Sequence, residues 1–255
     1  MKTSFQLFYN EVISNSKSLG LQESEECLYH GQSDTNYKLS AGIYRGNSYS
    51  IKNEESVFYE FRSKAIDLQK QTVSDWDILF YMQHYGCRTR LLDWTDNLGA
   101  ALFFALSDYK PGKTPAIYLL NPYDLNGYHT RNYDFYDPNN LDHKDGYSYA
   151  RMLQEDLKDP TSNKGIWWKK SLAIYPIRKS ERLKSQSGYF TIQGTDPRPL
   201  DEQISGKQNI WRKIEIPEEI ISEALEYLEL FGINEFTIYM DMQSLSKYLN
   251  RKYNL

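Results

Sequence analysis

The run Tyr29-His30-Gly31-Gln32 places a titratable imidazole directly before a glycine and an amide. An imidazole changes charge near neutral pH and can serve as a base, an acid or a hydrogen-bond partner. Gly31 has no Cβ, so the chain can turn sharply there or a ligand can approach its backbone closely. We therefore expect a short strand beginning at Leu28 to lead into a turn at these residues, with either a structural or a functional role.

A second run, residues 82–95, is dense in side chains that form hydrogen bonds. Asp93 has structural roles open to it, because it can pair with Arg90 or cap the apolar helix that follows. The run nevertheless holds more polar groups than capping requires, and Thr95 is itself a good cap. A functional role for these residues therefore stays open beside the structural one.

A third candidate is the segment around Arg182, Gln186 and Gly188, which precedes an aromatic strand containing Tyr189 and Phe190. The planar guanidinium of Arg182 is suited to hold a phosphate or a carboxylate. A solvated turn is the alternative interpretation.

The familiar catalytic signatures are absent. His30, His84, His129 and His143 do not form an HExxH or Cys/His ligand pattern, so we expect no metal site. The sequence also has neither a GxSxG nucleophile motif nor a GxGxxG nucleotide fingerprint.

The elements that must position these residues follow from hydrophobic periodicity. Predicted helices cover residues 4–16, 54–71, 75–85, 97–106, 149–157, 218–230 and 243–250, and predicted strands cover 28–29, 116–120, 172–177, 189–192 and 235–240. Residues 88–95 are expected to form a compact link. Helices in the first half and mainly strands in the second favour an α+β fold.

The predicted organisation is a single domain at residues 28–255, preceded by an N-terminal helical segment at 1–27. Residues 121–165 are polar and rich in Asn, Asp, Tyr and Gly, which indicates a long insertion that is either a lid or an inert surface loop.

Composition limits the partners. The formal net charge of −4 gives no long-range attraction for nucleic acid, so a polyanion would need a local basic patch, of which residues 164–182 are the best candidate. Two distant cysteines, the lack of a signal peptide and the lack of a membrane-spanning run predict a cytoplasmic protein without membrane contact.

The order of these motifs resembles the FRG domain of bacterial and phage-associated proteins. The resemblance covers about residues 28–249, and Arg-Leu-Leu-Asp-Trp-Thr at 90–95 is its most specific part. Its other motifs are residues 29–32, 39–45, 83–86 and 100–105, then Arg182, Gln186 and Gly188, and finally Gly232, Ile233 and Thr237. The family is named for Phe-Arg-Gly or Tyr-Arg-Gly, whereas this chain has His30 in place of the arginine.

The first motif also resembles the opening motif of ADP-ribosyltransferases, and that resemblance implies a split, mainly antiparallel sheet flanked by helices. In those enzymes the position of His30 holds the nicotinamide ribose of NAD, and the following glycine pairs its backbone with the carboxamide. The implied catalytic residues are His30 and a carboxylate, either Glu235 on a late strand or Asp93. The implied residues for NAD, the substrate, are His30, Gly31, Gln32, Tyr85, Arg90, Thr95 and Arg182, with Tyr85 and Phe103 or Phe104 as aromatic walls.

Three functions remain open on this basis. The first is an NAD-dependent ADP-ribosyltransferase, a bacterial toxin or anti-phage defence effector that modifies nucleic acid or protein and that has an antitoxin or another defence-system partner. The second is a non-catalytic module in which Asp93, its neighbours and residues 167–182 bind a nucleotide or nucleic acid. The third is a hydrolase that uses Asp93 with His84 as base, for which no nucleophile is evident.

Overall fold

A computed structural model describes residues 4–46, 49–65, 74–138, 149–150, 153, 169–175 and 186–255 of the chain. Its centre is a six-stranded sheet in the order β4-β5-β2-β1-β3-β6, and each neighbouring pair is antiparallel. The strands are β1 (Leu28–Gln32), β2 (Leu91–Thr95), β3 (Ala116–Leu120), β4 (Leu172–Ile174), β5 (Gly188–Ile192) and β6 (Trp211–Glu215). The predicted α+β class is confirmed.

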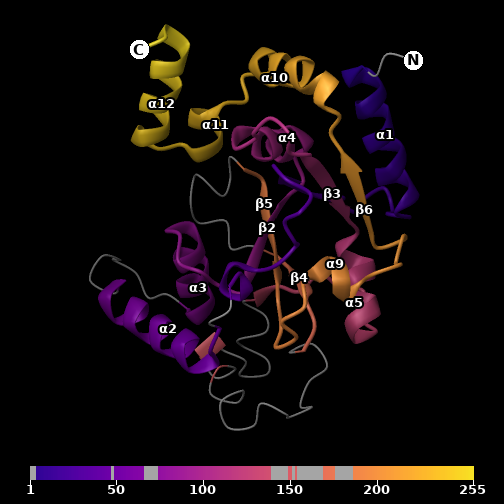
Figure 1. Ribbon diagram of the computed structural model, residues 1–255. Coiled ribbons are helices and arrows are strands. Elements are labelled where there is room, and N and C mark those ends of the chain that lie inside the picture. The colour runs from indigo at the N-terminus through magenta and orange to yellow at the C-terminus, as the bar shows by residue number, and fades with distance from the viewer. Residues whose placement is uncertain are drawn as a thin grey trace.

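Helices cover both faces of this sheet (Figure 1). They are α1 (Phe5–Ser18), α2 (Ile51–Ala65), α3 (Asp75–His84), α4 (Leu98–Ser107), α5 (Pro122–Thr130), α9 (Leu200–Gln203), α10 (Ile221–Leu230), α11 (Glu235–Tyr239) and α12 (Met242–Tyr253). On one face, α1, α4 and α10 pack over β1 and β3, and α2 and α3 pack over β2, β4 and β5. The opposite face is covered by α5 and α9.

The link expected at residues 88–95 is wrong, because residues 91–95 form the strand β2 in the middle of the sheet. Leu91, Leu92 and Trp94 are buried there, while Asp93 is exposed. A single polar residue interrupts an otherwise apolar run, so neither strict alternation nor a continuous apolar stretch marks the strand. The edge strand β6 was likewise not predicted.

The strand expected at residues 235–240 is also wrong, because these residues form the short helix α11. The apolar residues at this segment recur at every second position, the period typical of a strand, and they are Phe236, Ile238 and Met240. Asn234 decides the local structure, because its side chain accepts hydrogen bonds from the backbone N–H groups of Phe236 and Thr237 and so caps a helix.

Gly31 lies inside strand β1 rather than in a turn, so the expected turn is wrong as well. A Cβ built on Gly31 would lie 1.9 Å from Ala101 O and 2.7 Å from Ala105 N, both in the backbone of α4. The missing side chain therefore allows α4 to pack directly on β1.

The beginning of the predicted insertion is part of the packed domain. Helix α5 lies against β4, where Asn126 Nδ2 donates to Ala173 O (3.0 Å) and Ala173 N donates to Asn126 Oδ1 (2.8 Å). The helix predicted at 149–157 lies almost wholly outside the described residues. Within the described part of the chain, no helix combines the length and the apolar character needed to cross a membrane.

Candidate functional site

The sheet opens between its two central strands. Strands β1 and β2 form one register pair, Tyr29 with Thr95. Continuing that register would place His30 opposite Trp94 and Gly31 opposite Asp93, but the described strands form no such pairs. The main chains part there, and a cavity of about 920 Å³ lies at the opening.

The side chain of His30 crosses this opening. Its Nδ1 lies 2.7 Å from the main-chain carbonyl oxygen of Asp93. A carbonyl oxygen only accepts hydrogen bonds, so Nδ1 carries the proton and donates it. The ring of Trp94 lies 5.5 Å from that of His30, centroid to centroid, and Trp94 is itself held by a 3.1 Å hydrogen bond from Nε1 to Thr191 Oγ1.

His30 is uncharged at neutral pH. Loss of solvent around the ring lowers its pKa to about 4, and the positive charge of Arg45 acts in the same direction. The hydrogen bond to Asp93 O opposes this shift but is the smaller effect. Since Nδ1 holds the proton, Nε2 carries a lone pair, and it makes no hydrogen bond to any residue that the structure describes. His30 therefore offers the cavity a neutral acceptor.

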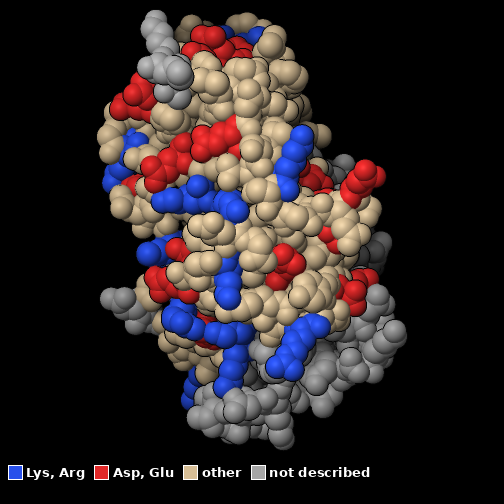
Figure 2. Space-filling model, turned by 90° about the vertical axis from the view of Figure 1, so that its right-hand side faces the viewer, with Lys and Arg blue, Asp and Glu red and all other residues tan. Residues whose placement is uncertain are grey.

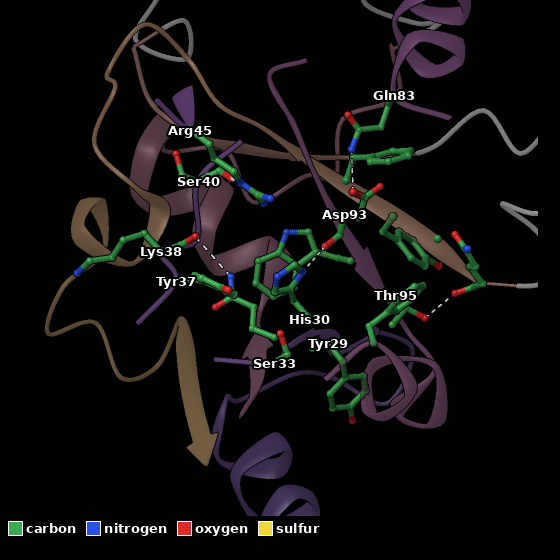
Figure 3. A pocket seen from close by; sticks show the side chains of 18 of the residues that line it. Tyr29, His30, Ser33, Tyr37, Lys38, Ser40, Arg45, Gln83, Asp93 and Thr95 are labelled. Atoms are coloured by element: carbon green, nitrogen blue, oxygen red, sulfur yellow. Dashed lines mark hydrogen bonds between the residues drawn. The ribbon is translucent and has the colours of Figure 1, made fainter. Parts of the chain in front are cut away.

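The carboxylate of Asp93 belongs to an ordered chain of side chains. Leu91 N donates to Thr89 Oγ1 (3.0 Å), Thr89 Oγ1 donates to Gln83 Oε1 (2.6 Å), and Gln83 Nε2 donates to Asp93 Oδ2 (2.7 Å). No role was assigned to Gln83 from the sequence. Because its amide oxygen is occupied by Thr89, the amide must turn its N–H toward Asp93. Figure 3 shows Gln83 and Asp93 facing one another at the cavity.

Several aromatic side chains contribute to the cavity walls. Its lining contains Tyr44, Phe80, Tyr81, Trp94, Phe104 and Tyr189, contributed by α3, α4, β2, β5 and the loop after β1. Such rings offer flat surfaces for stacking a planar base or ring. Pockets for small molecules usually measure about 300–1,000 Å³ and join apolar walls to a few polar groups. This cavity lies at the upper end of that range, which suits a ligand of several rings.

Two amide side chains at the cavity each have one buried atom without a hydrogen-bond partner among the described residues. Gln32 is 8% exposed, and its Oε1 makes no hydrogen bond within the described residues, although Nε2 donates to Lys38 O at 3.4 Å. Gln186 Nε2 is also buried and makes no hydrogen bond within the described residues. Buried polar atoms are normally satisfied, so both mark positions where a ligand or water would be bound.

Four of the residues implied for NAD binding, together with Asp93, lie at this cavity. They are His30, Gly31, Gln32 and Thr95. The hydroxyl of Thr95 is already engaged, since it donates to Gln186 O (2.6 Å) and accepts from Asn97 N (3.0 Å). Of the two phenylalanines considered as walls, Phe104 lines the cavity and Phe103 is buried in the core. His84, the base of the hydrolase hypothesis, also lines it.

Arg90, also implied for NAD binding, lies away from the cavity. It is 1% exposed and forms a two-pronged ion pair with Glu54, from Nε to Oε1 at 2.8 Å and from Nη2 to Oε2 at 2.9 Å. Tyr49 and Tyr149 complete this cluster by donating their hydroxyls to Glu54. Arg90 thus ties α2 to the start of β2 and does not line the cavity.

Glu235, Tyr85 and Arg182 are not brought to the cavity by the described structure. Glu235 lies on α11 and pairs with Arg251 through two bonds of 3.0 Å, and Arg251 holds its pKa below the ordinary value although burial acts the other way. Tyr85 is 71% exposed and is not among the lining residues. Arg182 lies outside the described residues.

The basic stretch considered for nucleic acid is described only in part, at Lys169, Lys170 and Tyr175. Lys170 Nζ pairs with Asp196 Oδ2 at 2.9 Å. The molecular face over α1 and β6 carries both signs of charge, with acidic side chains more frequent in the upper part of Figure 2 and basic ones in the lower part. No group of three or more His, Cys, Asp or Glu side chains suited to a metal ion occurs in the part of the chain that is described.

Residues 25–114 match the family model of the FRG domain. The FRG match begins before β1 and ends just before β3, so it includes His30, Arg45, Gln83 and Asp93. It supports the resemblance seen in the sequence for this segment, while the motifs after residue 114 lie beyond it. No curated protein and no solved structure matches the chain.

Proposed function

We propose that this protein is an NAD-dependent ADP-ribosyltransferase-like enzyme whose substrate binds in the opening between β1 and β2. The observation that carries the proposal is the placement of His30 and Asp93 on facing strands at the point where the sheet parts. One strand contributes a neutral hydrogen-bonding group, the other contributes a carboxylate, and both residues line a large cavity.

The polar groups of the cavity fit the nicotinamide ribose. Its hydroxyls are donors, and the two acceptors of β1 at this point are His30 Nε2 and Gln32 Oε1, neither of which has a partner in the described structure. The planar nicotinamide ring would lie against the aromatic walls. In this arrangement the sugar lies along β1 and its anomeric carbon faces β2.

Asp93 takes the part of the catalytic carboxylate. In the reaction the bond from the anomeric carbon to the nicotinamide nitrogen breaks, and nicotinamide leaves neutral with the electron pair. The remaining ribosyl cation is stabilised by the negative charge of Asp93. A nucleophile of the acceptor then forms the new bond to the anomeric carbon, and its proton passes to Asp93, which acts as the base in this proposal.

The test is the release of free nicotinamide from NAD by the purified protein, with and without cell extract as the source of an acceptor. We expect release, and we expect Asp93→Asn to reduce it about 100-fold or more, because the isosteric amide lacks the charge. Glu235→Gln is the matched control, since it removes a carboxylate that lies outside the cavity. No release by the unaltered protein under either condition would refute the proposal.

The same assay distinguishes the proposed enzyme from a binding module. A module that only binds nucleotides would bind ADP-ribose or NAD without releasing nicotinamide.

A further inference from the structure

Arg45 lines the cavity beside His30, and no role was assigned to it from the sequence. We propose that Arg45 forms an anion-binding subsite that takes the pyrophosphate of the nucleotide and so orients it in the cavity. The identity of the ligand rests on the proposed function, but the subsite itself is testable with inorganic pyrophosphate.

The backbone that presents Arg45 is held in place. The residue follows the 3-10 turn Gly42–Tyr44, and Ile43 N donates to Thr89 O at 3.0 Å, which ties this turn to the segment leading into β2. Arg45 Nε donates to Ser40 O at 2.8 Å. With Nε bound in this way, the plane of the guanidinium has a defined direction. Figure 3 shows the guanidinium turned inward, toward His30.

Among the described residues, no carboxylate pairs with the guanidinium of Arg45. Its two terminal nitrogens form no hydrogen bond or ion pair with the residues that the structure describes. Two of the lining carboxylates have other partners: Asp77 Oδ2 accepts from Ser74 N (2.9 Å) in the cap of α3, and Asp93 Oδ2 accepts from Gln83. A guanidinium with two terminal nitrogens turned to a cavity is suited to bind phosphate oxygens in a two-pronged manner.

Lys38 provides a contrast within the same lining. Its ammonium points away from the cavity in Figure 3 and pairs with Glu202 Oε1 at 3.4 Å. The described lining thus contains one lysine, which faces outward, and one arginine, which faces inward. His30 adds no positive charge, because it is neutral. Of the lysine and arginine side chains in the described lining, Arg45 is the one that faces inward.

The consequence is a direction for the ligand. The ligand would place three groups in order across the cavity. Its anionic group lies at Arg45, its ribose at His30 and Gln32, and the carbon that develops positive charge at Asp93. This is the order of groups in a nucleotide whose pyrophosphate precedes a reactive ribose. The subsite thus favours ligands with a pyrophosphate over nucleosides that lack one.

The experiment measures dissociation constants for ADP-ribose, inorganic pyrophosphate and adenosine by calorimetry. Arg45→Gln should weaken ADP-ribose and pyrophosphate binding about 10- to 100-fold, the loss of one charged hydrogen-bonding partner, and should leave adenosine binding within about twofold. Arg45→Lys should give dissociation constants for ADP-ribose and pyrophosphate between those of the unaltered protein and Arg45→Gln, because a point charge replaces the planar guanidinium. Lys38→Gln removes the same charge from the outer face and should change all three constants by less than about twofold.

The outcomes are distinguishable. If Arg45→Gln binds ADP-ribose and pyrophosphate as the unaltered protein does, or if the unaltered protein binds neither, the subsite is refuted. An equal loss from Lys38→Gln would refute it too, because the effect would then be one of general charge. Binding of pyrophosphate that depends on Arg45, combined with no release of nicotinamide from NAD, would leave the subsite standing and refute the proposed enzyme.

Discussion

His30 Nδ1 donates to the main-chain oxygen of Asp93 over 2.7 Å, and this bond spans the place where β1 and β2 separate. A side chain thereby replaces the main-chain ladder at the centre of the sheet. The bond fixes the imidazole tautomer and holds the opening at a set width. The properties of His30 can therefore be tested apart from any reaction.

The first prediction concerns the protonation of His30. Its pKa should lie near 4, well below the ordinary value of about 6.5, and the neutral ring should be the Nδ1–H tautomer. Nuclear magnetic resonance titration of the ring measures both. Arg45→Gln should raise this pKa, because the guanidinium charge contributes to lowering it. A titration of His30 near 6.5 would contradict the assignment.

The same shift predicts how stability depends on pH. Between about pH 6.5 and 4 the unfolded imidazole binds a proton that the folded one does not, so the free energy of unfolding should fall as pH falls through this window. In His30→Gln the fall in the free energy of unfolding over this pH window should be smaller by roughly 1–3 kcal/mol. Denaturant unfolding at pH 7 and at pH 4.5 provides the measurement. His129, whose pKa is also lowered by burial, acts in the same direction in both proteins and cancels in the comparison.

The second prediction concerns the contact of Gly31 with α4. Gly31→Ala should destabilise the fold by about 3 kcal/mol or more, because the new methyl group would meet the rigid backbone of Ala101 and Ala105. Gly42→Ala is the matched control, since its nearest neighbour would be Arg88 Cα at 3.6 Å, an ordinary contact. Thermal unfolding should separate the two variants clearly. Equal stabilities would contradict the close packing of α4 on Gly31.

The third prediction concerns the buried pair Arg90 and Glu54. Removing one partner, as in Glu54→Gln, should cost about 3–5 kcal/mol, because Arg90 would remain buried without its counter-charge. The joint replacement Glu54→Leu with Arg90→Met should be less damaging than either single change. Glu60→Gln breaks the exposed pair with Lys64 and should have no measurable effect on unfolding. A mild effect of Glu54→Gln would mean that water reaches Arg90.

The fourth prediction concerns Gln83 as a positioning residue for Asp93. Gln83→Leu removes the donor to Asp93 Oδ2 and should lower kcat for nicotinamide release about tenfold with little change in KM, because the substrate contacts remain. Thr89→Val should have a smaller effect in the same direction, since it frees the amide of Gln83 to rotate. Gln83→Glu should be the most damaging, because it places like charges together. A change confined to KM would argue against this role.

The sequence by itself determined much of this protein: the α+β class, most of the helices, the strand at residues 116–120, and His30 and Asp93 as candidates for chemistry. These depend on local periodicity, capping and residue type. Glu235 was misplaced because its neighbours alternate like a strand, whereas the cap by Asn234 favours a helix.

Only the tertiary structure decided how these parts meet. His30 and Asp93 are 63 positions apart, and nothing local specifies that their strands pair at Tyr29 and Thr95 and then separate. Arg90, in the most specific motif, is used to anchor α2, while the less conspicuous Arg45 faces the cavity. The physical reason is that the sequence shows an arginine at each position but does not show what surrounds it. Whether it meets a buried carboxylate or an open cavity depends on residues that only folding brings beside it.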